Sequence, residues 1–119
     1  MRRTAYLVKS LLVAGLLAGC ASAPPPIERM ESSTAAIRAA AEVGAAQVPQ
    51  AALHLQLAKE QSEHARELIA QGDRPRAEGL LMRAEADAEL AVALARESTA
   101  KAEAQQAKDK IRAYRQGEL

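Results

Sequence analysis

The chain has 119 residues, enough for one domain, and 29 of them are alanine, whereas Phe and Trp are absent and Tyr occurs twice. Its 16 basic and 15 acidic side chains are interspersed, so no basic face of the kind that holds nucleic acid is predicted. The single cysteine excludes an intramolecular disulfide and a cysteine-based metal cluster. Because Ala, Glu, Lys, Arg, Gln and Leu are strong helix formers, the composition predicts an all-α protein with a core of small side chains.

Residues 1–19 have the pattern of a cleaved signal peptide. Arg2, Arg3 and Lys9 provide a positive segment, and the apolar run that follows, residues 11–17, is well short of the roughly 20 residues that a membrane span needs. Removal of this segment leaves 13 basic and 15 acidic side chains, a net charge of −2. The segment is therefore interpreted as an export signal rather than a membrane span or a buried helix.

The end of this segment, Leu17-Ala18-Gly19-Cys20, resembles the lipobox of bacterial lipoproteins. The resemblance implies cleavage between Gly19 and Cys20, a thioether-linked diacylglycerol on Cys20, and acylation of its new amino group. Two or more acyl chains anchor a protein stably, because each buried CH₂ contributes ~0.8 kcal/mol. Ala21, rather than an Asp, follows the cysteine, and by the same resemblance this implies sorting to the periplasmic face of the outer membrane. No other cofactor and no metal are expected.

A short tether is predicted over residues 20–26, from the lipidated Cys20 to the last of three consecutive prolines. Such a run favours extended polyproline II at ~3.1 Å per residue, which makes a semi-rigid spacer. A helical domain is then expected over residues 27–115, followed by a C-terminal tail at 116–119.

Two shorter helices are predicted in the first part of this domain, at about 27–46 and 49–71. The first has an apolar stripe at three- and four-residue steps, and Gly44 and Pro49 bracket its end. In the second, the core-facing stripe is predicted to contain Leu53, Leu57, Gln61, Ala65 and Leu68.

A tight turn is predicted at Gly72 and Asp73. Glycine suits the left-handed position after a helix, Asp suits the position that caps the next helix, and Pro75 fits a first helical turn. This combination predicts an antiparallel helical hairpin.

The third predicted helix, at about 74–115, is roughly 60 Å long at 1.5 Å per residue. Its first part carries a seam of mostly small side chains: Ala77, Leu81, Ala84, Ala88, Ala91 and Ala95. Beyond Ala95 the apolar stripe moves to nearly the opposite side of the helix and comprises Ala100, Ala104, Ala107, Ile111 and Tyr114. The second helix is expected to cover the seam, and the first helix, or another chain, to cover the other stripe. The predicted fold is an elongated three-helix bundle, a hairpin with a preceding third helix.

The predicted hairpin also has an Ala- and Glu-rich pattern. It comprises Gln71-Gly72-Asp73, Ala77, Leu80, residues 84–91 and residues 93–95, preceded by Ala58, Ala65 and Arg66 and by the Gly44 and Pro49 break. These residues resemble a family of short bacterial lipoproteins filed as a domain of unknown function (type 4398). The chain departs from the family at Arg74, where an aromatic residue is expected, and at Ser62, where an apolar one is expected. Some relatives continue into a peptidoglycan-binding domain like that of outer-membrane protein A; since this chain ends at Leu119, that role is not expected of it.

Candidate catalytic groups are few. His54 and His64 do not share a helical face, although Glu60 and His64 lie one turn apart and could touch. Residues 32–34 are hydroxyl side chains without a recognisable base or oxyanion site, and Glu85, Asp87 and Glu89 alternate around the helix. No phosphate-binding glycine loop or metalloprotease motif is present in the sequence. The chain is therefore not expected to be an enzyme.

The expected function is that of a membrane-anchored structural or protein-interaction module of the cell envelope. Its candidate interaction face is the stripe Ala100–Tyr114, and its partner would be an envelope protein or a second copy. The alternative is a chaperone-like envelope-assembly factor that binds an apolar ligand or peptide, although large side chains to line a pocket are few. Attachment to peptidoglycan in the manner of the murein lipoprotein is disfavoured, because the chain ends Gly117-Glu118-Leu119 rather than in lysine.

Overall fold

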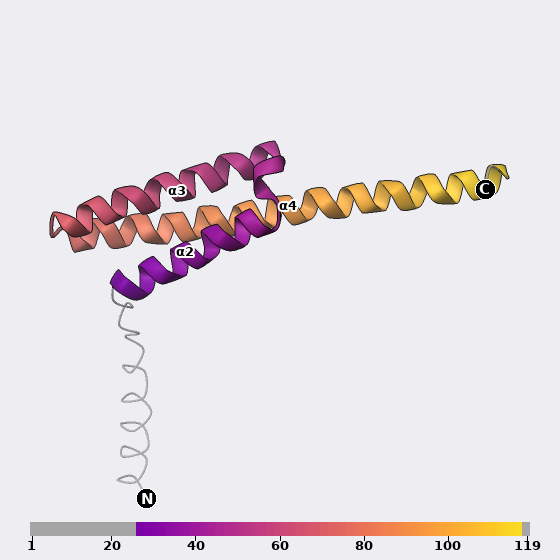
Figure 1. The fold of residues 1–119 in the computed structure, drawn as a ribbon. Helices are drawn as coiled ribbons and strands as arrows, with labels where there is room; N and C mark the ends of the chain where they lie inside the picture. The colour runs from indigo at the N-terminus through magenta and orange to yellow at the C-terminus, as the bar shows by residue number, and fades with distance from the viewer. Residues whose placement is uncertain (1–25, 118–119) are drawn as a thin grey trace, which may run out of the picture.

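The structure, a computed structural model, describes residues 26–117 as helices joined by short turns (Figure 1). In chain order these are α2 (Pro26–Glu42), the 3₁₀ turn η2 (Ala45–Gln47), α3 (Pro49–Ala70) and α4 (Arg74–Gln116). The predicted signal peptide, the lipidation site at Cys20, the tether up to residue 25 and the last two residues lie outside the described part. Within residues 26–117 the protein is an all-α, elongated three-helix bundle, as predicted.

The α3–α4 hairpin is the largest unit of the fold. Gly72 has φ of +83°, in the left-handed region where a side chain is strained, and its amide donates to the carbonyl of Ile69. Asp73 then caps α4 by accepting a hydrogen bond from the Arg76 amide at 3.3 Å. The structure therefore places the turn at Gly72 and Asp73, the two residues that the sequence singles out.

The seam predicted on α4 is confirmed. Its buried residues are Ala77, Leu81, Ala84, Ala88, Ala91 and Ala95, each exposed by 1% or less. Figure 1 shows α2 and α3 packed against the first part of α4, on different sides of it. Small side chains allow helix axes to approach toward the short end of the roughly 8–10 Å range, which explains why alanine dominates this core.

The stripe predicted on α3 is confirmed at Ala65 and Leu68, which are buried, and is wrong in the first part of the helix. The residues that α3 buries are Ala51, Leu55, Ala58, Ser62, Ala65 and Leu68, whereas Leu53 is 58% exposed. Leucines lie on more than one side of α3, so side-chain size does not identify the core face. Ala and Ser are buried because they match the close approach that the α4 seam imposes.

The first helix, α2, ends at Glu42 rather than near Ala46. Gly44 takes φ of +77°, and the chain turns through η2 before Pro49 begins α3. The reversal brings Ala45 into one core cluster with Ala40, Ala51, Leu55, Ala91 and Ala95. The short turn thereby closes the end of the bundle from which α4 emerges.

Two parts of the molecule are named from here on. The bundle comprises residues 26–98, in which α2 and α3 cover α4. The α4 extension comprises residues 99–116, where α4 continues alone and every residue but Ala113 is exposed (Figure 1). At 1.5 Å per residue the extension is roughly 27 Å long.

Candidate functional site

The stripe predicted as an interaction face lies on the α4 extension and is fully displayed. Ala100, Ala104, Ala107, Ile111 and Tyr114 are all exposed, with 53% of Ile111 and 70% of Tyr114 accessible. The first helix does not cover it, contrary to one of the two expectations for this stripe, because α2 packs against the bundle part of α4.

The stripe also continues into the bundle, which sequence reasoning missed. Ala86, Leu90 and Ala93 precede it at the same three- and four-residue steps and are exposed too, Leu90 by 42%. The steps pass through Glu97, whose charge hides the continuity in the sequence. We call this whole set the outer face of α4: Ala86, Leu90, Ala93, Glu97, Ala100, Ala104, Ala107, Ile111 and Tyr114.

A groove lies beside the outer face, between α2 and α4. Its volume is about 540 Å³, and it is lined by Ala35, Ala36, Ala39, Glu89, Val92, Ala93 and Arg96. The walls are short apolar side chains, with one acidic and one basic residue on the α4 side. Such a groove suits the side of another helix, because small residues on both surfaces allow backbones to approach closely.

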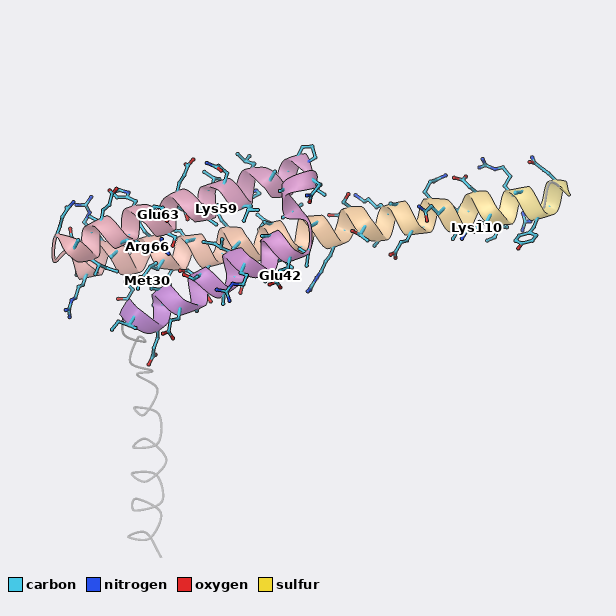
Figure 2. The ribbon with its side chains drawn as sticks, viewed as in Figure 1. Met30, Glu42, Lys59, Glu63, Arg66 and Lys110 are labelled. Atoms are coloured by element: carbon cyan, nitrogen blue, oxygen red, sulfur yellow. The ribbon has the colours of Figure 1, made fainter. Side chains whose placement is uncertain are left out.

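Charge divides the molecule into two unlike parts. The bundle carries twelve Asp or Glu and eight Lys or Arg, whereas the extension carries five basic side chains and two acidic ones. Figure 2 shows Lys110 on the extension, far from Lys59, Glu63 and Arg66 of α3. The extension is therefore a basic, amphipathic helix attached to an acidic bundle.

A polar cluster joins α3 to α4 inside the bundle. His54 Nδ1 lies 2.8 Å from Asp87 Oδ1, and the Gln61 amide donates to Asp87 Oδ2 at 2.9 Å. Both members of the His54–Asp87 pair are about three-quarters buried, with side-chain exposures of 27% and 22%. Sequence reasoning compared His54 with His64 and missed Asp87, because the interhelical register that brings the two together is set only in the folded hairpin.

Comparison with known families assigns most of the described chain to one family model. The family model described as Domain of unknown function (DUF4398) matches residues 28–107, more than half of the chain. The chain belongs to the DUF4398 family. No curated protein and no solved structure matches it. The match covers the bundle and about half of the extension.

One departure from the family pattern lies in the core of this DUF4398 protein. Ser62 is 3% exposed within the α3 core face, and its hydroxyl has no hydrogen-bond partner among the described residues. A buried hydroxyl without a partner destabilises the fold relative to an apolar side chain of similar size. Arg74, the other departure, is exposed at the start of α4, where its side chain needs no pocket.

The remaining candidate groups of the DUF4398 chain have structural partners. Ser33 and Thr34 donate to the carbonyl of Met30 at 3.1 and 2.7 Å, a local pattern that occupies helix hydroxyls. Glu60 accepts from Gln56 at 2.7 Å, and no hydrogen bond joins it to His64 in the described chain. Among residues 26–117 no three His, Cys, Asp or Glu side chains gather as metal ligands.

The alternating carboxylates of α4 are distributed among different neighbours. Glu85 and Glu78 both lie within 4 Å of the Arg29 guanidinium of α2, at 3.8 and 3.9 Å, so one cation orients α2 along α4. Asp87 faces α3 and Glu89 lines the groove. They therefore form no paired acid–base site.

None of the helices in the described part of the chain, residues 26–117, combines the length and the apolar character needed to cross a bilayer.

Proposed function

We propose that this DUF4398 protein is a lipid-anchored lipoprotein of the cell envelope that acts as a structural or protein-interaction module through the α4 extension. The observation that supports the proposal most directly is the exposed outer face of α4, which neither α2 nor α3 covers. Aromatic and large aliphatic side chains exposed on one helix face are typical of protein-binding surfaces. The proposal assigns no catalytic step.

The anchor in this proposal is Cys20, at the outer membrane and facing the periplasm. Its support is the sequence pattern of a short signal peptide followed by Leu17-Ala18-Gly19-Cys20. Replacement of Cys20 by Ser should abolish acylation and release the chain from the membrane fraction. An unchanged amount of chain in the outer-membrane fraction would contradict the anchor.

The bundle provides the point of attachment for the proposed anchor. Met30, near the start of α2, packs against the cluster that contains Leu68 and Leu81 beside the hairpin turn. Figure 1 shows that the start of α2 and the C-terminal end of α4 lie at opposite ends of the described chain. A tether joined to α2 would therefore attach the molecule to the membrane by the bundle, at the end opposite the tip of the extension.

In-cell photo-crosslinking tests the interaction surface. We expect a photoreactive amino acid at Tyr114 or Arg96 to give a protein adduct, and the same group at Lys59, exposed on α3, to give none. The Ile111→Glu change should reduce the adduct at Tyr114 and leave the helix content by circular dichroism unchanged. Absence of an adduct at Tyr114, or equal adducts at Lys59, would contradict the proposal.

A second candidate function is that of an assembly factor that binds an apolar ligand or peptide. The groove of about 540 Å³ between α2 and α4 is the observation in its favour. Ligand pockets of this size are usually lined by large aromatic and aliphatic side chains, whereas Val92 is the largest apolar residue here. Native mass spectrometry of the chain purified from membranes would show a bound lipid or peptide if this function holds, and an unliganded mass if it does not.

A further inference from the structure

We propose that the partner of the outer face of α4 is the outer face of a second copy of this chain, packed antiparallel about a two-fold axis near Ser98 and Thr99. The inference rests on the proposed function, because it identifies the protein that the extension binds. In this arrangement the extension of each copy lies against the bundle part of α4 in the other, beside the groove.

The spacing of the outer face is that of a coiled coil. Its nine positions, from Ala86 to Tyr114, alternate four- and three-residue steps, which place them on one seam of a heptad repeat. All nine are exposed, so the seam is open along its whole length. Eight of them are apolar, which is the composition expected of a buried helix pair.

The face is complementary to itself when the two helices run in opposite directions. With Ala104 of one copy opposite Ala93 of the other, Ala107 meets Leu90 and Ile111 meets Ala86. Leu90 and Ile111 thus each face an alanine, which keeps the helices close there. In the same register Tyr114 meets Arg83, and Glu97 meets Ala100, of the other copy. A two-fold axis makes every such contact occur twice, as in the closed interfaces of most homodimers.

Charge complementarity selects this register. The two charged residues of the groove are Glu89 and Arg96, on the flank of α4 that faces α2. In the proposed pair this flank of α4 meets the same flank of the second copy, two residues along from the seam contacts. Lys110 of the second copy then lies beside Glu89, and Glu103 of the second copy lies beside Arg96. The basic extension therefore meets the acidic bundle, with two opposite-charge pairs that each occur twice.

Neighbouring registers lack this match. A shift of one heptad toward the extension places Arg96 opposite Lys110 and brings the two Glu103 side chains together. A shift of one heptad toward the bundle places Glu103 opposite Glu89 and brings the two Arg96 side chains together. A parallel pair sets Arg96 beside Lys101 and Lys110 beside Arg115. Since like charges at flanking positions disfavour a pairing, only the first register satisfies both flanking pairs.

Cysteine pairing between two differently tagged full-length chains tests the register. One chain carries Ala93→Cys and the other Ala104→Cys, both expressed together in cells with the anchor in place. We expect a disulfide-linked dimer when the two are mixed, because facing Cα atoms approach the roughly 4.4–6.8 Å that a disulfide requires. Either variant alone should give little dimer, since two Ala93 or two Ala104 positions would lie about 16 Å apart along the axis. The parent chain, with Cys20 as its one cysteine, is the background control.

Charge reversal in the same chains tests the flanking pairs. Lys110→Glu should lower the fraction of Ala93–Ala104 crosslink about fivefold, because it turns two attractions to Glu89 into repulsions. The compensating change Glu89→Lys should restore the crosslink. Arg112→Glu is the matched control: it makes the same change of charge two residues away, on a side of the helix that does not face the second copy, and should leave the crosslink unchanged.

The outcomes separate the two proposals. A Tyr114 photo-adduct with a different polypeptide, without the mixed disulfide, would overturn self-pairing and leave the proposed function in place. Strong disulfides within either single variant would overturn the antiparallel register. Absence of both the mixed disulfide and any Tyr114 adduct would overturn the self-pairing and the interaction function together.

Discussion

The bundle and the α4 extension share one helix but owe their stability to different forces. In the bundle, six residues of α4 are buried almost completely against α2 and α3. In the extension no such packing exists, and residues 99–112 are all exposed. Most helices in proteins are stabilised by packing of an apolar face, so the extension is the unusual part.

Local interactions account for the helical state of the extension. Its junction with the bundle supplies a helix that is already nucleated, which removes the costly first turn. Glu97 pairs with Lys101, and Asp109 accepts from Gln105 and lies 3.6 Å from Arg112, all one turn apart. Gly117, with φ of +71°, ends the helix in the left-handed conformation. Before Ser98, α4 is therefore stabilised by its contacts with α2 and α3. After Ser98 it is stabilised by pairs between its own side chains, until a partner is added.

The largest expected difference between the two parts comes from removal of a buried leucine. Leu81 is fully buried, so Leu81→Ala should lower the free energy of unfolding by about 3 kcal/mol through lost burial and a residual cavity. Ile111→Ala, at a residue that is 53% exposed in the extension, should change the free energy of unfolding of the monomer by less than about 0.5 kcal/mol. Urea denaturation followed by circular dichroism measures both. Equal effects would mean that the extension is packed in the free chain.

Replacement of an alanine by a larger side chain should also affect stability differently in the bundle and in the extension. Ala88 lies in the seam with no exposed surface, so Ala88→Leu should destabilise the bundle by about 1–3 kcal/mol through overpacking. Ala104→Leu in the extension meets no neighbour within the chain, and leucine is a good helix former, so the free energy of unfolding should stay nearly unchanged. Thermal denaturation of the two variants checks this, and a stable Ala88→Leu variant would show that the α4 seam is looser than described.

Loss of a carboxylate should have a smaller effect, again confined to the bundle. Asp87→Ala leaves the His54 ring and the Gln61 amide without their acceptor and should cost about 1 kcal/mol, moderated by partial access to water. Asp109→Ala, its counterpart in the extension, breaks only exposed pairs and should cost under about 0.5 kcal/mol. A double-mutant cycle with His54→Ala isolates the interhelical part. Zero coupling between His54 and Asp87 would contradict the structural role of this cluster.

The sequence identified those features that local geometry determines. The α4 seam was predictable because its small residues recur at helical spacing over several turns, and no other residue set on that side competes with it. The hairpin turn was predictable because Gly72, Asp73 and Pro75 each suit one backbone position and occur in the required order.

Features that depend on how helices meet were not predictable in the same way. The core face of α3 was misassigned because Leu53 has the right chemistry but lies on the wrong side once α4 imposes close packing. His54 and Asp87 are 33 residues apart, so their contact requires the hairpin register. The outer face of α4 was recognised only from Ala100 onward, since Glu97 interrupts its apolar sequence while keeping its spacing.

The smallest expected effect is a pH response at the junction of the two parts. The Lys101 ammonium hydrogen-bonds to and attracts the Glu97 carboxylate and holds the pKa of Glu97 below its ordinary 4.5. Because the folded pKa is the lower one, the pair stabilises the helix above the ordinary value, and this contribution is lost as the pH falls through the lowered pKa. An NMR titration of the Glu97 side chain should therefore show a midpoint below 4.5, and Lys101→Met should raise that midpoint, whereas Lys110→Met should not. Since Glu97 is exposed in the single chain, 1 M salt should also raise the midpoint of the monomer, because the Debye length is then about 3 Å. A midpoint at or above 4.5 in the parent chain would remove the pair from the forces that maintain the extension.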